Sequence, residues 1–177
     1  MGDSTLWLRG FTDEGRTSAV LAITIAGTPV NPADPDSVLH WIIYYDIGPG
    51  RAIKFDMLPG GGPDGMTGCL QVVVCDATAA RAQELAASFT AETAAPEPVT
   101  GQRILDLLLD APRRRNRYKY DETGSGCRFW CRTVLEDLEE AGIVPAGSLG
   151  SFDEYVLRKS EENPARFPMP TRRGRFY

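Results

Sequence analysis

The chain has 177 residues, of which 42% are hydrophobic and 24% are charged, and its formal net charge at pH 7 is −5. These values predict one globular domain with a hydrophobic core and exclude a disordered or fibrous chain. The single histidine, His40, excludes metal sites that need two or three imidazole ligands, and we expect neither a metal nor a cofactor. We predict a domain over residues 1–162 and a basic tail, rich in proline and arginine, over residues 163–177.

The first half of the chain is rich in β-favouring residues that are separated by turn signals. Residues 79–95 fit both a helix and a strand, and we interpret them as a helical turn followed by a strand. The clearer strands are predicted from alternation and from β-branched and aromatic content, and they cover residues 18–25, 38–46, 51–58 and 68–75.

The sequence pattern of the second half of the chain predicts helices. Thr100 is a suitable N-cap for a helix whose apolar residues recur at helical spacing. A Gly-Ser-Gly turn at 124–126 precedes an amphipathic helix over 127–141, and a capping-box pattern at 151–154 predicts a short last helix. Because strands are followed by helices, we expect an α+β fold in which an antiparallel sheet packs against helices on one face.

Cys127 is a candidate nucleophile because it follows two glycines and begins a predicted helix. The positive end of the helix dipole stabilises a thiolate there, and Arg128 adds positive potential. Backbone N–H groups in the first turn of a helix have no partners within the helix, so they could stabilise an oxyanion. The competing interpretation is a small, inert core residue, and this is the interpretation we favour for Cys69, Cys75 and Cys131.

The N-terminal residues are acidic and no long apolar run follows them, a pattern that does not predict a secretory signal. No apolar stretch has the length that crossing a bilayer requires. We therefore expect a cytoplasmic protein with no membrane span. Thiols are reduced in that compartment, so we expect no disulfides among the four cysteines.

His40 is the candidate general base. It stands near the start of the strongest predicted strand, where alternation places His40, Ile42 and Tyr44 on one face. A histidine on a strand beside a cysteine at a helix start is an arrangement that allows the imidazole to take the thiol proton and later to protonate a leaving group.

The segment His-Trp-Ile-Ile-Tyr-Tyr at 40–45, followed by Arg-Ala-Ile-Lys-Phe-Asp at 51–56, resembles the opening hairpin of the lecithin:retinol acyltransferase-like group. Gly-Cys-Arg-Phe-Trp-Cys at 126–131 resembles the helix start of that group and of the PPPDE peptidases. Both are circularly permuted papain-like (NlpC-type) thiol enzymes, in which the histidine strand precedes the cysteine helix. The whole chain also resembles an uncharacterised, mainly fungal domain family, a resemblance that implies no activity.

The first resemblance implies a permuted papain-like arrangement with Cys127 as nucleophile and His40 as base. Those acyltransferases place a second polar residue, often histidine, on the returning strand, where this chain has Lys54 and Asp56. An aspartate accepts a hydrogen bond from an imidazole N–H and a lysine cannot, so we expect Asp56 to orient His40. The chain also has Gly126 where those enzymes often have asparagine before the cysteine.

We therefore expect a cysteine-dependent hydrolase or acyltransferase that acts on an amide, ester or thioester bond of a small-molecule or peptide substrate. The remaining candidate site residues are Tyr118 and Tyr120, as the lining of the cleft, and Arg128 and Lys54, as contacts for an anionic group of the substrate.

Two alternatives remain at this stage. The same fold could serve as a non-catalytic binding or dimerisation module, and the sequence does not define the oligomeric state. The basic cluster Arg113–Arg117, together with the basic tail, could instead bind an anion or nucleic acid. The negative net charge and the few aromatic residues in these segments argue against nucleic acid.

Overall fold

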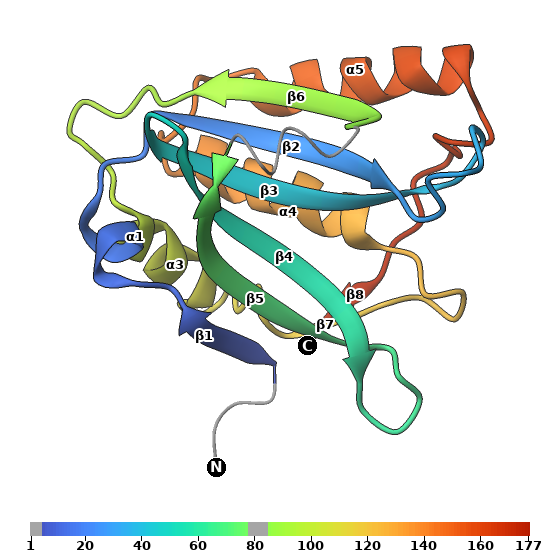
Figure 1. Cartoon of the computed structure of the whole chain (residues 1–177), viewed down its shortest axis with the longest axis horizontal. Coiled ribbons are helices and arrows are strands. Elements are labelled where there is room, and N and C mark those ends of the chain that lie inside the picture. The colour runs from blue at the N-terminus through green and yellow to red at the C-terminus, as the bar shows by residue number, and fades with distance from the viewer. Residues whose placement is uncertain (1–4, 78–84) are drawn as a thin grey trace.

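The computed structural model describes residues 5–77 and 85–177, which form one eight-stranded sheet with helices packed against it (Figure 1). The strands are β1 (Leu6–Gly10), β2 (Ala22–Pro29), β3 (Leu39–Gly48), β4 (Arg51–Gly61), β5 (Thr67–Asp76), β6 (Ala87–Glu92), β7 (Tyr118–Lys119) and β8 (Arg175–Phe176). The helices are α1 (Asp13–Thr17), α3 (Gly101–Leu109), α4 (Cys127–Glu140) and α5 (Ser148–Glu162).

The strands lie in the order β6-β2-β3-β4-β5-β7-β8, with β1 alongside β5. Only the β1–β5 pair is parallel among the described strands, so the predicted α+β fold with an antiparallel sheet is confirmed. The strand predicted over 18–25 starts later, at Ala22, and β1 was not predicted. In the ambiguous segment 79–95 the strand is β6, whereas most of the expected helical turn lies outside the described residues.

Alternation along β3 separates two clusters of buried side chains. Trp41, Ile43 and Tyr45 belong to the main core, which also contains the apolar residues of α3, α4 and α5. Ile42 and Tyr44 belong to a smaller cluster, as expected for the opposite face of the strand.

The start of α3 is defined by its local sequence, whereas the start of α5 is defined by a residue of another helix. Thr100 caps α3, because its hydroxyl accepts a hydrogen bond from the Arg103 N–H at 3.3 Å, as predicted. The last helix, α5, begins before the predicted capping box. Its first N–H groups are bound by Glu139 of α4, whose carboxylate accepts from Gly147 at 3.0 Å and from Leu149 at 2.7 Å.

Strands β3 and β4 are paired near their connecting turn and separate at the other end of the hairpin. Their paired residues run from Gly48–Arg51 only as far as Ile43–Phe55, although β3 starts at Leu39 and β4 continues to Gly61. Beyond that point β3 remains paired with β2 and β4 remains paired with β5. Figure 1 shows the two strands diverging from their connecting turn, which leaves one edge of β3 without a neighbouring strand over its first residues.

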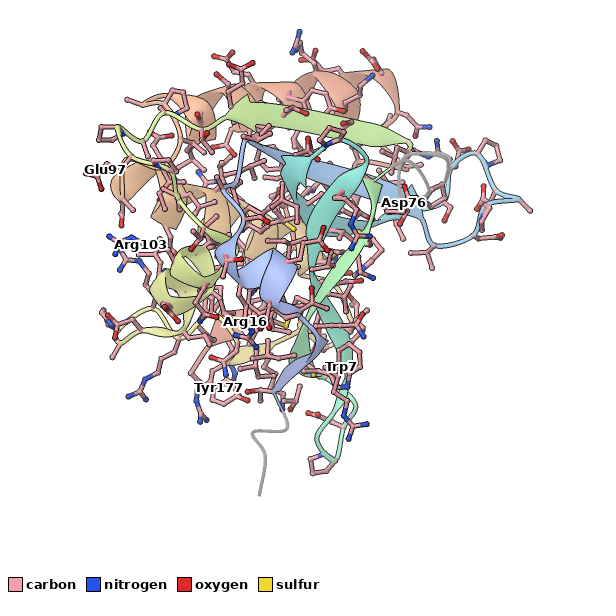
Figure 2. The ribbon with its side chains drawn as sticks, turned by 60° about the vertical axis from the view of Figure 1, so that its left-hand side comes forward. Trp7, Arg16, Asp76, Glu97, Arg103 and Tyr177 are labelled. Atoms are coloured by element: carbon pink, nitrogen blue, oxygen red, sulfur yellow. The ribbon has the colours of Figure 1, made fainter. Side chains whose placement is uncertain are left out.

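Residues 163–177, the predicted tail, pack on the domain. Phe167 is buried, with its ring edge-on to Trp41 at 6.2 Å between centroids. The Gly174 N–H donates to the Tyr118 hydroxyl at 2.9 Å, and Phe176 of β8 pairs with Tyr118 of β7. The C-terminus therefore lies beside β7, whereas charged side chains such as Glu97 and Arg103 project outward on another side (Figures 1 and 2).

Two arginines of the Arg113–Arg117 cluster have structural partners. Arg115 forms two hydrogen bonds to the buried carboxylate of Asp137 on α4, at 2.6 and 2.8 Å, and Arg113 forms a third at 3.1 Å. The Arg115 guanidinium also lies 4.7 Å from the centre of the Phe176 ring. These contacts tie the segment after α3 to α4 and to the C-terminus.

We predict that Asp137→Asn lowers the free energy of unfolding by about 2 kcal/mol or more, because it removes the buried charge that binds the Arg113 and Arg115 guanidinium groups and leaves Arg113 only its longer contact to Glu140, at 3.6 Å. Urea unfolding measures the change. Glu154→Gln, at an exposed position of α5, is the control and should change stability by less than about 0.5 kcal/mol. Equal effects of the two substitutions would show that the Asp137 contacts contribute nothing.

Candidate functional site

His40 and Asp56 are joined across the opening between β3 and β4. The Nε2 atom of His40 lies 2.7 Å from Oδ1 of Asp56, whose side chain is only 6% exposed. A carboxylate can only accept, so Nε2–H donates to it, and the second ring nitrogen, Nδ1, is left to gain or release a proton. The second carboxylate oxygen of Asp56 accepts from the Lys54 ammonium at 3.3 Å.

Cys127 approaches His40 along the open edge of β3. The His40 carbonyl points toward β2, where it accepts from the Thr28 hydroxyl at 3.4 Å. Because successive carbonyls of a strand point to opposite edges, the Leu39 carbonyl points to the edge that β4 has left. The Cys127 sulfur donates a hydrogen bond to that carbonyl oxygen at 3.8 Å, and it lies close enough to the His40 side chain to interact with it. The divergence of the strands thus lets a residue of α4 reach His40.

The start of α4 is held by a glycine and by a hydrogen bond from the tyrosine beneath it. Gly126 has φ +143°, and the Tyr118 hydroxyl donates to its carbonyl at 2.9 Å. A β-carbon at position 126 would lie 2.6 Å from the Tyr118 hydroxyl oxygen, so the position strongly favours glycine. The first hydrogen bond within the helix runs from Trp130 N–H to Gly126, which leaves the N–H groups of Cys127 and Arg128 without helical acceptors.

The surroundings of His40 favour its protonated form. Burial by itself lowers the pKa of the imidazole, but the hydrogen bonds to Asp56 and Cys127 and the negative charges of both groups outweigh burial. Together they raise the pKa of His40 from 6.5 to about 10. His40 therefore carries a positive charge beside the Cys127 sulfur at neutral pH.

A cavity of about 690 Å³ opens beside Cys127 and His40. Its floor includes the glycine turn before α4, and its walls come from the segment between β2 and β3, the end of β4 and the C-terminal segment. The lining residues combine apolar side chains with three arginines: Val30, Val38, Leu39, His40, Trp41, Leu58, Pro59, Tyr120, Gly124, Ser125, Gly126, Cys127, Arg128, Ala165, Arg166, Pro168, Thr171 and Arg172.

The structure brings Cys127, His40, Asp56 and Lys54 together, but two of the predicted site residues do not line the cavity. Tyr118 is fully buried beneath Gly126 and is not among the described residues that line the cavity. Lys54 is likewise outside that lining, because its ammonium is turned toward Asp56.

Tyr120 and Arg128 do line the cavity, but their polar groups are engaged with the backbone. Tyr120 donates its hydroxyl to the Met57 carbonyl, and Arg128, which is 7% exposed, donates to the Pro168 carbonyl. Sequence reasoning placed Arg166 and Arg172 in a tail, so it missed their position in the cavity wall. The only signal for them was the basic character of that segment.

Among the described residues, no group of three or more histidine, cysteine, aspartate or glutamate side chains could hold a metal ion. None of the four cysteines forms a disulfide bond. No helix in the described part of the chain has the length and apolarity to cross a membrane.

The fold is thus an α+β domain whose opened sheet brings together an aspartate, a histidine hydrogen-bonded to it and a cysteine that interacts with that histidine. The chain belongs to the family described as Domain of unknown function (DUF7770), which matches residues 23–177 and so includes all three of these residues. No curated protein matches the chain, and no solved structure matches it.

We predict that the free energy of unfolding depends on pH through His40. The folded protein keeps a proton on His40 that the unfolded chain releases above about pH 6.5, so this stabilisation is complete below about pH 6.5 and is lost as the pH rises to about 10. Urea unfolding of the native chain and of His40→Gln should therefore show a stability difference that shrinks between about pH 6.5 and about pH 10. A difference that is constant over this range would contradict the prediction.

We predict that Gly126→Ala destabilises the protein more than Gly124→Ala. Both glycines have positive φ, but a β-carbon at 124 meets nothing within 4 Å, whereas at 126 it meets the Tyr118 hydroxyl. Gly124→Ala should cost about 1 kcal/mol of backbone strain, and Gly126→Ala should cost about 1–2 kcal/mol more. Thermal or urea unfolding compares the pair, and equal losses would show that the Tyr118 contact does not constrain the start of α4.

Proposed function

We propose that the protein is a cysteine-dependent hydrolase or acyltransferase that acts on an amide, ester or thioester bond. The observation that carries this proposal is the position of His40, which is hydrogen-bonded to Asp56 on one side and interacts with Cys127 on the other, at the wall of a cavity. A nucleophile, a base within hydrogen-bond reach of it and a third group that orients the base are the parts that thiol catalysis needs.

In the first half of the proposed reaction, the Cys127 thiolate attacks the carbonyl carbon of the substrate and forms a C–S bond. The carbonyl electron pair moves to oxygen, and the resulting oxyanion is within the field of the first N–H groups of α4. The tetrahedral intermediate then collapses. The C–N, C–O or C–S bond to the leaving group breaks, and the His40 imidazolium protonates that group.

In the second half, neutral His40 takes a proton from water or from an acceptor amine, which attacks the thioester carbonyl. The bond to the Cys127 sulfur breaks, the thiolate is restored, and His40 is again an imidazolium. Asp56 keeps one ring nitrogen of His40 protonated throughout, which leaves the other nitrogen to exchange protons with substrate and sulfur.

We also propose that the domain has a circularly permuted papain-like arrangement. In support, the histidine strand β3 precedes the cysteine helix α4 in the chain, and the orienting Asp56 lies on the returning strand β4. A thiol nucleophile is compatible with the reducing cytoplasm that we propose as its location. The engagement of Arg113 and Arg115 by Asp137 weakens the alternative in which that cluster binds nucleic acid.

We predict that iodoacetamide alkylates Cys127 at least about tenfold faster than Cys69, Cys75 or Cys131 at neutral pH, because only Cys127 has an imidazolium partner. Mass spectrometry of peptides from a time course gives the rates. His40→Gln should slow the labelling of Cys127 by about tenfold or more, and Asp56→Asn should slow it less. Cys75→Ser is the matched control and should leave the Cys127 rate unchanged.

The direct test of turnover is the acyl-enzyme. Incubation with a p-nitrophenyl ester should add one acyl group to Cys127, seen in the intact mass, and Cys127→Ser should abolish the release of p-nitrophenol. His40→Gln should reduce the rate by about 10²-fold or more. If all four thiols are alkylated equally slowly and no acyl adduct forms, the protein is a non-catalytic member of its fold.

A further inference from the structure

The cavity beside Cys127 carries positive charge that the protein does not neutralise. Arg128 is 7% exposed, yet its contacts in the structure are the Pro168 carbonyl oxygen and, at 3.8 Å, the Met169 sulfur. No carboxylate among the described residues lies within ion-pair distance of it. A buried cation without a counterion is costly, and a bound anion would offset that cost.

Arg166 provides a second unpaired cation on the same wall. One of its terminal nitrogens donates to the Asp34 carbonyl at 3.3 Å, but its Nε atom is buried and has no hydrogen-bond partner. A buried N–H donor without an acceptor is uncommon in folded proteins and points to a group that the protein alone does not supply. Arg166 also has no carboxylate partner among the described residues.

Arg172 completes the cationic wall. Its side chain is 57% exposed, and among the described residues its ion pair is a long contact of 3.6 Å to Asp121. In the described part of the chain, no aspartate or glutamate lines the cavity. Asp56, the carboxylate beside His40, is already paired with His40 and Lys54.

Another part of the lining is apolar. Val30 and Val38 flank the segment between β2 and β3 and are 66% and 50% exposed, and the lining also includes Leu39, Leu58 and Pro59 from the two separated strands. A cavity that combines an apolar surface with a group of arginines fits a ligand with one apolar end and one charged end.

We propose that the substrate is an anionic amphiphile: an acyl compound whose apolar chain lies along Val30, Val38 and Leu58, and whose carboxylate or phosphate group is bound by Arg128, Arg166 and Arg172. This proposal rests on the proposed thiol chemistry in one respect, which is that the carbonyl group to be cleaved lies at Cys127. The guanidinium group suits both anions, because its planar pair of N–H donors matches two oxygens of either one.

The first experiment uses Cys127 itself as the probe. Iodoacetate and iodoacetamide deliver the same alkyl carbon, and only iodoacetate carries a charge. The measured quantity is the rate of alkylation by iodoacetate divided by the rate of alkylation by iodoacetamide. At low salt this ratio should be at least about threefold higher for Cys127 than for Cys75, because the arginines attract the charged reagent, and added NaCl should reduce the difference.

Arg166→Gln and Arg172→Gln should each lower this ratio toward the value for Cys75. Arg172 is exposed, so its variant keeps the test usable if the Arg166 variant does not fold. Arg103→Gln is the matched control, because Arg103 projects from α3 and does not line the cavity (Figure 2). A ratio for Cys127 that equals that of Cys75, or that Arg103→Gln lowers as much as Arg166→Gln does, would contradict the proposal.

The second experiment does not depend on catalysis. Isothermal titration of the Cys127→Ala variant should show that octanoate or octyl phosphate binds at least about tenfold more tightly than octan-1-ol. Which of the two anions binds more tightly distinguishes a carboxylate substrate from a phosphate substrate. Arg166→Gln in the same background should remove the preference for the anion.

The two proposals fail in different ways. Anion-selective binding with slow, unselective labelling of Cys127 would overturn the thiol chemistry and retain the anionic ligand. Fast labelling of Cys127 with equal binding of octan-1-ol and the two anions would retain the chemistry and overturn the substrate class.

Discussion

The parting of β3 from β4 beyond the Ile43–Phe55 pair is the constraint on which the site depends. In a continuous sheet, β4 would occupy the edge of β3 to which the Leu39 carbonyl points, and a helix packed on one face could not reach His40. β3 stays paired with β2, and β4 stays paired with β5, so the sheet opens without disrupting the core. The edge of β3 that is exposed in this way faces the start of α4. The twist that β-strands favour makes such a separation accessible in a long hairpin.

The separation of β3 and β4 brings Cys127 to His40 only if the start of α4 is accurately positioned. Gly126 defines this position through its positive φ and through the hydrogen bond that its carbonyl accepts from the Tyr118 hydroxyl. Tyr118 is in turn held by Gly174, so the C-terminal segment supports the reaction centre as well as forming one wall of the cavity. Backbone contacts of this kind position the thiol more rigidly than a flexible side-chain cap would.

Cys127 and His40 could be predicted from the sequence because each lies in a strongly patterned segment, at a helix start or on an alternating strand. Asp56 was predicted from the resemblance to the permuted acyltransferases, which have a polar residue on the returning strand, and from its ability to accept a hydrogen bond from an imidazole N–H. It did not predict the separation of β3 and β4, since strand register beyond a hairpin depends on neighbours distant in the chain. It also misplaced the start of α5, which is capped by Glu139 of another helix. Arg166 was missed as a site residue because its segment has no periodic pattern and is positioned by packing against Trp41 and the 31–38 segment.

The central claim is that Asp56, His40 and Cys127 act as one electrostatic unit, and the single histidine makes it directly measurable. A proton NMR titration follows one imidazole without assignment of other histidines. We expect the His40 resonance to show a protonated ring through neutral pH and a pKa near 10, with lower values in Cys127→Ala and in Asp56→Asn. A His40 pKa near the ordinary value of 6.5 that neither substitution changes would contradict the account.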